Sequence, residues 1–72
     1  MSPRLPVVSG RETLRALAKA GYAEISRRGS HVKLRRDSRT VIVPLHRELA
    51  PGTLRSVLRQ ADLTVEQFTQ LL

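Results

Sequence analysis

The residues best suited to chemistry in this chain lie in one short basic segment around His31. Arg28 precedes His31 by three positions and Lys33 follows it by two. An ordinary imidazole titrates at about pH 6.5, so it can accept or donate a proton at cellular pH, and nearby cations stabilise charge growing on phosphorus. RNA supplies its own nucleophile, the 2′-hydroxyl, so such a group could cleave a phosphodiester. Spacing alone, however, favours an ordinary exposed strand histidine.

Other kinds of chemistry find less support in the sequence. His46, the second of two histidines, is either a second proton-transfer group or a loop residue, and spacing favours the loop. Two histidines without cysteine or an acidic cluster make a poor metal site. Ser30 has no recognisable base beside it, and no Gly-rich phosphate loop is present. We therefore expect a site that uses neither a metal nor a cofactor.

The charge composition narrows the choice of partners. The 72 residues include 13 Lys and Arg against six Asp and Glu, a net charge of +7, and 11 of the 13 are Arg. Arginine binds phosphate in bidentate fashion, so nucleic acid is the first candidate, an anionic membrane the second and an acidic protein the third. The chain has no cysteine, which fits a reducing compartment. Because we find neither a membrane-spanning run nor a signal peptide, we expect a soluble cytoplasmic protein.

Hydrophobic spacing predicts the elements that must position these residues. The length is enough for one domain, spanning residues 1–72, in which residues 1–8 form an extended lead-in. Ser9 and Glu12 have capping-box spacing and begin a helix, which ends at Gly21. The predicted apolar stripe of this helix consists of Leu14, Leu17 and Ala18.

Two hairpins are predicted after this helix. Gly29-Ser30 is typical of a two-residue type II′ turn, and a second reversal is centred on Asp37-Ser38. Pairing across the first turn sets Arg28 opposite His31, Ile25 opposite Leu34 and Glu24 opposite Arg35. Pairing across the second sets Leu34 opposite Val41 and Val32 opposite Val43. One sheet face then carries Ile25, Val32, Leu34, Val41 and Val43, and the other carries Ser26, Arg28, His31, Lys33 and Arg35.

Two helices complete the expected chain. Pro51 and Gly52 begin the first, with an apolar stripe of Leu54, Val57, Leu58 and Ala61. The second starts at Thr64, has Gln67 at capping-box spacing, and can pack Phe68 against the body. The order α-β-β-β-α with a short extra C-terminal helix predicts an α+β fold. In that fold, helices cover one face of a three-stranded antiparallel sheet.

The open sheet face decides how the basic segment is interpreted. Six basic residues and one acidic residue lie between Arg27 and Arg39. A solvated hairpin is the ordinary interpretation, but the predicted register gathers Arg28, Lys33 and Arg35 beside His31. This arrangement favours binding of a polyanion. Ile42 falls on the same face, where it either fills a strand edge or offers an apolar contact to a base or a partner protein.

Several short motifs follow one another in a distinctive order from about Leu14 to the end of the chain. They are Gly21-Tyr22, Arg28-Gly29-Ser30-His31, Val43-Pro44-Leu45-His46, Pro51-Gly52-Thr53-Leu54-Arg55 and Glu66-Gln67-Phe68. Gly-Ser-His alone is common, but the combination at these separations is specific. In this order and spacing the chain resembles the HicA toxin family.

The resemblance implies more than the composition does. It implies a fold like that of double-stranded-RNA-binding domains and an mRNA interferase, an endoribonuclease that cuts RNA without needing the ribosome. His31 is then the catalytic residue. With RNA as the substrate, the face that the strand register predicts, with its adjoining turn, supplies the residues expected to bind it, Arg28, Ser30, Lys33 and Arg35. A HicB antitoxin encoded beside the toxin is expected to bind it and mask the active site. The resemblance assigns no catalytic role to His46.

Two other functions remain open from the sequence. The same fold occurs in modules that bind A-form RNA by its shape without cleaving it, so the inference of an enzyme rests on His31 and the resemblance. The chain could therefore be a non-catalytic RNA-binding module. It could also be an interaction protein whose basic face serves only an acidic partner. Binding to a membrane surface comes last, because neither main helix combines a basic face with a large exposed apolar one.

Overall fold

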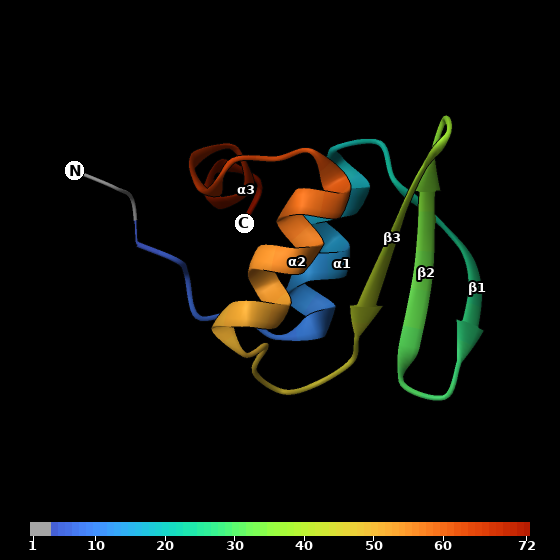
Figure 1. Cartoon of the computed structure of the whole chain (residues 1–72), viewed down its shortest axis with the longest axis horizontal. Coiled ribbons are helices and arrows are strands. Elements are labelled where there is room, and N and C mark those ends of the chain that lie inside the picture. The colour runs from blue at the N-terminus through green and yellow to red at the C-terminus, as the bar shows by residue number, and fades with distance from the viewer. Residues whose placement is uncertain (1–3) are drawn as a thin grey trace.

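The predicted α+β architecture is confirmed by a computed structural model of the chain, which describes residues 4–72. The elements in order are α1 (Gly10–Lys19), β1 (Ala23–Arg28), β2 (His31–Arg36), β3 (Arg39–Pro44), α2 (Pro51–Ala61) and α3 (Val65–Leu71). The three strands form one antiparallel sheet in the order β1-β2-β3. The helices lie together beside the sheet, with β3 nearest to them and β1 farthest away (Figure 1). This is a fold of the double-stranded-RNA-binding-domain type with an added C-terminal helix.

Residues at the helix ends behave as their spacing predicts. The Ser9 backbone N–H donates to a Glu12 carboxylate oxygen at 2.9 Å, and the Glu12 N–H donates to the Ser9 hydroxyl at 3.0 Å. The first of these bonds, together with the Ser9 hydroxyl, holds the pKa of Glu12 below its usual value. The stabilisation contributed by the Glu12 carboxylate is therefore present at neutral pH and is lost as the pH falls through that pKa, whereas the bond to the Ser9 hydroxyl does not depend on this ionisation. Gly21 has a φ of 95°, as expected after a helix end.

Two details of the N-terminal region concern the predicted lead-in and stripe. Residues 4–8 have no regular secondary structure, as predicted for the lead-in, whereas residues 1–3 of that prediction lie outside the described residues. The predicted α1 stripe is wrong at Ala18, which is exposed, while Ala16 and Leu17 are buried. An alanine contributes little to a hydrophobic pattern, so the sequence does not distinguish which alanine faces the core.

The turns and the register of the second hairpin match the prediction. Arg28 pairs with His31 around Gly29-Ser30, and Gly29 has a φ of 58°, a conformation that glycine adopts without strain. Across the second hairpin, Leu34 pairs with Val41 and Val32 with Val43. All four of these apolar side chains are buried. His31 and Lys33, which alternate with them along β2, are exposed on the opposite face.

The predicted register of the first hairpin is wrong beyond Ser26. A β-bulge between Glu24 and Ser26 leaves Ile25 without a partner, so that Glu24 pairs with Leu34 and Ala23 pairs with Arg35. Ile25 is therefore not a core residue, and half of it is exposed. The physical reason is the position of β1, which lies at the edge farthest from the helices and has no buried residue. No packing partner pulls Ile25 inward.

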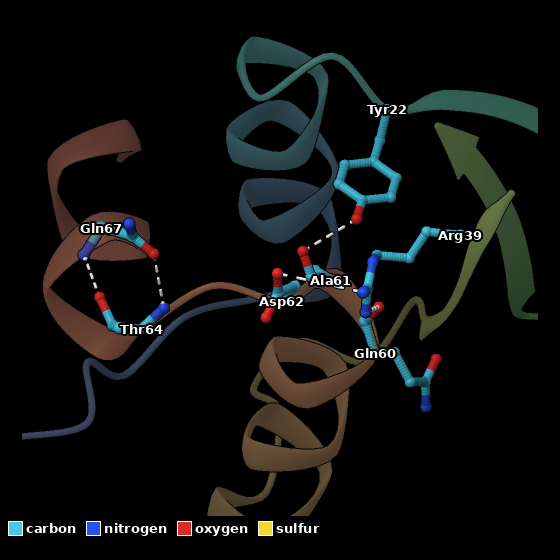
Figure 2. A network of polar contacts seen from close by, with 7 residues as sticks. All are labelled: Tyr22, Arg39, Gln60, Ala61, Asp62, Thr64 and Gln67. Atoms are coloured by element: carbon cyan, nitrogen blue, oxygen red, sulfur yellow. Dashed lines mark hydrogen bonds and ion pairs between the residues drawn. The ribbon is translucent and has the colours of Figure 1, made fainter. Parts of the chain in front are cut away.

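The core lies between the sheet and the helices and continues behind them. One cluster joins Leu17 of α1 and Val57 of α2 to the buried valines and Leu34 of the sheet, and a second surrounds Phe68 of α3, which packs back as predicted. Tyr22 connects these layers, because its hydroxyl donates to the carbonyl of Ala61 at 2.9 Å (Figure 2). The predicted α2 stripe of Leu54, Val57, Leu58 and Ala61 is fully buried.

α2 also lies against the free edge of β3. The side-chain carbonyl of Gln60 accepts the Ile42 backbone N–H at 2.8 Å, a donor that has no strand partner on that side. The Gln60 amide in turn donates to Ser56 at 3.1 Å. Arg39 of β3 donates to the backbone carbonyl of Gln60 at 3.2 Å (Figure 2). These bonds hold α2 beside the sheet and give the outward N–H of Ile42 a hydrogen-bond partner.

The start of α1 is in close contact with the end of β3. The Gly10 N–H donates to the carbonyl of His46 at 2.9 Å. A methyl group at Gly10 would overlap the Pro44 carbonyl oxygen and would lie 2.8 Å from Leu45 Cα. Since both neighbours are backbone, neither can rotate away. Only glycine fits at this point.

Gly10→Ala is therefore expected to destabilise the fold. Overpacking against backbone costs about 1–3 kcal/mol, and each kcal/mol lowers the melting temperature of a domain this size by roughly 4–8 °C. Gly52→Ala is the matched control, because its new methyl group meets nothing within 4 Å in the first turn of α2. That change should leave the melting temperature equal or raise it. Thermal unfolding followed by circular dichroism measures both, and equal shifts would contradict the close contact.

Candidate functional site

His31 lies on the open sheet face, at the start of the central strand. It is the first residue of β2 and pairs with Arg28 on β1 and with Pro44 on β3. Lys33 lies two positions further along β2 and pairs with Ser26 and Ile42. Paired residues in neighbouring strands share a face, so these side chains form one surface. His31 is exposed on it.

Two open hollows meet at His31 and Ile42, which line both of them. The first has a volume of about 500 Å³ and is lined by Ser26, Arg27, Arg28, His31, Lys33 and Ile42. The second, of about 440 Å³, is lined by His31, Ile42, Pro44, His46, Gly52, Thr53, Ser56, Val57 and Gln60. The first lies over β1 and β2, whereas the second is a groove between the sheet and α2. His31 can therefore reach a molecule that occupies either side.

The predicted site residues are only partly gathered around these hollows. Arg28 and Lys33 line the first hollow together with His31. Arg35 lies two positions beyond Lys33 on β2, by strand alternation on the same face, but it lines neither hollow. Ser30 is exposed in the turn and also lines neither, while its backbone carbonyl accepts the Leu45 N–H at 2.7 Å.

Sequence reasoning missed the contribution of α2 to the site. Thr53 and Ser56 present hydroxyl groups in the second groove, opposite the histidine on the strand. His46, for which the sequence left two interpretations open, lines the same groove. The Pro-Gly-Thr segment was recognisable as a motif. Its place beside the open face, however, depends on how α2 packs against β3, which local sequence does not encode.

The six basic residues between Arg27 and Arg39 divide into two groups of three. Arg27 forms an ion pair with Glu24 at 3.0 Å. Arg36 donates to the carbonyl of Ala20 at 2.7 Å and lies 5.0 Å from the centre of the Tyr22 ring. Arg39 bonds Gln60 and approaches Asp62 at 4.0 Å. These three side chains are therefore used within the fold.

The other three are the predicted phosphate ligands, Arg28, Lys33 and Arg35. Within residues 4–72, their side chains form none of the hydrogen bonds and ion pairs found in the structure. The residues paired with them across the sheet include no carboxylate. Cations without an acidic partner on one face attract anions and remain available to bind them.

The described part of the chain contains neither a metal-binding cluster nor a membrane-spanning helix. Among residues 4–72, no three His, Asp or Glu side chains lie together in a group that could hold a metal ion. No helix in this range is long and apolar enough to cross a membrane.

Comparison with known proteins decides the family. A family profile described as the HicA toxin of bacterial toxin-antitoxin systems matches residues 10–63, from the first residue of α1 to just beyond α2. The chain belongs to the HicA toxin family. This HicA protein is accordingly the toxin of a toxin–antitoxin pair, with an antitoxin as its partner. The matched range includes His31, His46 and both hollows, and excludes α3. No curated protein matched the chain in a sequence search.

Because the side chain of Arg36 has partners within residues 4–72 and that of Arg35 has none, replacing these two neighbours on β2 should affect the free energy of unfolding differently. Arg36→Ala removes a hydrogen bond to a helix-end carbonyl and a cation–π contact, so it should lower the free energy of unfolding by about 1–2 kcal/mol. Arg35→Ala, the matched control, removes a side chain without an internal partner and should change it by less than about 0.5 kcal/mol. Urea unfolding measures both. Equal losses would show that the two side chains are not used differently.

Proposed function

We propose that this HicA toxin is a metal-independent endoribonuclease of the cytoplasm that cleaves mRNA with His31 as its catalytic residue. In this proposal the chain acts as one domain, Arg28, Ser30, Lys33 and Arg35 bind the RNA, and a HicB-type antitoxin inhibits the toxin by covering the same face. The observation that carries it is the position of His31. It is exposed where two hollows meet, beside cations that have no acidic partner.

The chemistry requires little more than these residues. Removal of the proton from a 2′-hydroxyl lets that oxygen attack the neighbouring phosphorus, and the bond from phosphorus to the 5′-oxygen breaks. The products are a 2′,3′-cyclic phosphate and a 5′-hydroxyl, so a proton must be removed at one oxygen and supplied at the other. His31 transfers a proton in this reaction. Arg28 and Lys33 stabilise the charge that develops on the phosphoryl oxygens.

The remaining ligands hold the RNA in register. Residues two apart on one face of a strand are about 7 Å apart, so Arg35 can contact a phosphate next to the one held by Lys33. The Ser30 hydroxyl, exposed in the turn before His31, can donate to phosphate or ribose oxygens. RNA therefore crosses the open face along β2, with the scissile phosphate at His31.

The same features support the proposed mode of inhibition. An antitoxin that covers His31 also covers Arg28, Lys33 and Arg35, which would be buried without counter-charges. Burial of unpaired charge is costly. A HicB-type antitoxin is therefore expected to present acidic side chains to this face, and to compete with RNA for it.

His31→Ala is expected to abolish RNA cleavage while leaving the fold intact. Loss of a proton-transfer group lowers the rate by at least about 10²–10⁴-fold, whereas an exposed strand side chain contributes little to stability. Purified wild-type and mutant chains are compared on full-length transcripts, and excess EDTA should not slow the wild type. Induced expression should arrest growth only for the wild type.

Three results would contradict this proposal. Intact RNA with the wild type, combined with salt-sensitive RNA binding, would indicate a non-catalytic RNA-binding module. No RNA affinity at physiological salt would indicate a protein-binding surface alone. A collapse of the mutant's melting temperature would show that His31 is structural.

The phosphate ligands are tested by the salt dependence of RNA binding to the cleavage-deficient His31→Ala chain. Each further change of Arg28, Lys33 or Arg35 to Ala should weaken binding and reduce the slope of log K against log salt by about 0.7–0.9. Arg59→Ala is the control, because Arg59 is exposed on α2 and lines neither hollow. If Arg59→Ala changes the slope as much as the others, the open face is not the RNA-binding surface.

A further inference from the structure

We propose that His46 is a second catalytic residue, which forms with His31 the proton-donor and proton-acceptor pair of RNA cleavage. This inference rests on the proposed ribonuclease function and adds a residue to it. The sequence left His46 open between a proton-transfer group and a loop residue. The structure brings it to the same groove as His31, although the two residues belong to different segments of the chain.

A backbone hydrogen bond joins the residues that immediately precede the two histidines. The N–H of Leu45 donates to the carbonyl of Ser30 at 2.7 Å. Ser30 immediately precedes His31, and Leu45 immediately precedes His46, so this bond joins the chain one residue before each imidazole. A second bond, from the Gly10 N–H to the His46 carbonyl at 2.9 Å, joins the His46 backbone to the start of α1. The two histidines therefore hold a defined relative position.

The described residues that line the groove offer few ionisable groups for proton transfer. Of the residues that line it within residues 4–72, only His31 and His46 have ionisable side chains. The others are apolar or carry hydroxyl or amide groups, as in Thr53, Ser56 and Gln60. The nearest charges in sequence or across the strands are Arg28 and Lys33 beside His31, and Arg47 and Glu48 after His46.

The fold does not use the His46 side chain. It is exposed, and within the described residues it takes part in none of the side-chain hydrogen bonds or ion pairs of the structure. Only its backbone carbonyl has a partner. A loop histidine whose backbone is hydrogen-bonded, and which lines a groove together with His31, is placed to meet a bound molecule.

The reaction supplies a task for each imidazole. A neutral imidazole accepts the proton of the 2′-hydroxyl while the new bond from that oxygen to phosphorus forms. The other, protonated imidazole donates its proton to the 5′-oxygen as the bond from phosphorus to that oxygen breaks. One proton is taken up and one is released, so the pair returns to its starting state only after exchange with water.

The decisive variant is His46→Gln, which retains size and hydrogen bonding but cannot transfer a proton at neutral pH. The rate of cleavage of a short RNA should fall about 10²–10⁴-fold, with the melting temperature unchanged. Glu48→Gln, in the same loop, is the control and should retain the wild-type rate to within about threefold. A wild-type rate that is bell-shaped in pH should lose one limb in His46→Gln, because one titrating group is gone.

An RNA with sulfur in place of the bridging 5′-oxygen identifies the donor. A thiolate leaves without protonation. This substrate should therefore restore cleavage by the variant that lacks the proton donor, and should not restore cleavage by the variant that lacks the proton acceptor. Recovery of either His46→Gln or His31→Ala, but not both, supports the pair. The pair is excluded if His46→Gln cleaves ordinary RNA at the wild-type rate, or if its pH profile keeps both limbs. Absence of cleavage by the wild type contradicts the proposed function instead.

Discussion

The arrangement of the open face depends on the close approach of Gly10 to the end of β3. At this point the start of α1 touches the Pro44 carbonyl and donates to the His46 carbonyl. One residue away, Leu45 bonds the turn that precedes His31. Three segments that are distant in sequence are thus joined through backbone atoms, which cannot change rotamer. A side chain at Gly10 would separate the helix from the loop and disturb the geometry of both histidines.

Strand alternation lets one short hairpin serve both stability and binding. Successive residues of a strand point to opposite faces, so Arg36 reaches back to Tyr22 and the end of α1 while Arg35 remains on the open face. Arg27 and Arg28 both line the first hollow beside His31, but only Arg27 is paired with a carboxylate, that of Glu24. The high arginine content is therefore not a uniform cationic coat. Of the six basic residues between Arg27 and Arg39, three have partners within the fold and three are available to a ligand.

Most of the fold could be predicted from the sequence because its determinants are local. Capping boxes at Ser9 and Thr64, the turn at Gly29 and the alternation of Val32 and Leu34 are each encoded within a few residues. The position of His31 among cations followed from the same alternation. The bulge at Ile25 did not, because β1 is exposed on both faces and its pattern carries no information about an extra residue. The groove that contains His46 could not be predicted from local sequence either, since residues of α2 form one of its walls.

The two edge strands of the sheet, β1 and β3, differ in whether another element covers them. α2 covers the edge of β3, where the side-chain carbonyl of Gln60 accepts the outward N–H of Ile42. No element within residues 4–72 covers the outer edge of β1, and a free strand edge is a template on which another chain can add a strand. The bulge at Ile25 interrupts the regular spacing of donors and acceptors along that edge, and the Glu24–Arg27 pair adds charge to it. The same irregularity that displaces Ile25 from the core therefore disfavours pairing of this edge with the edge of another sheet.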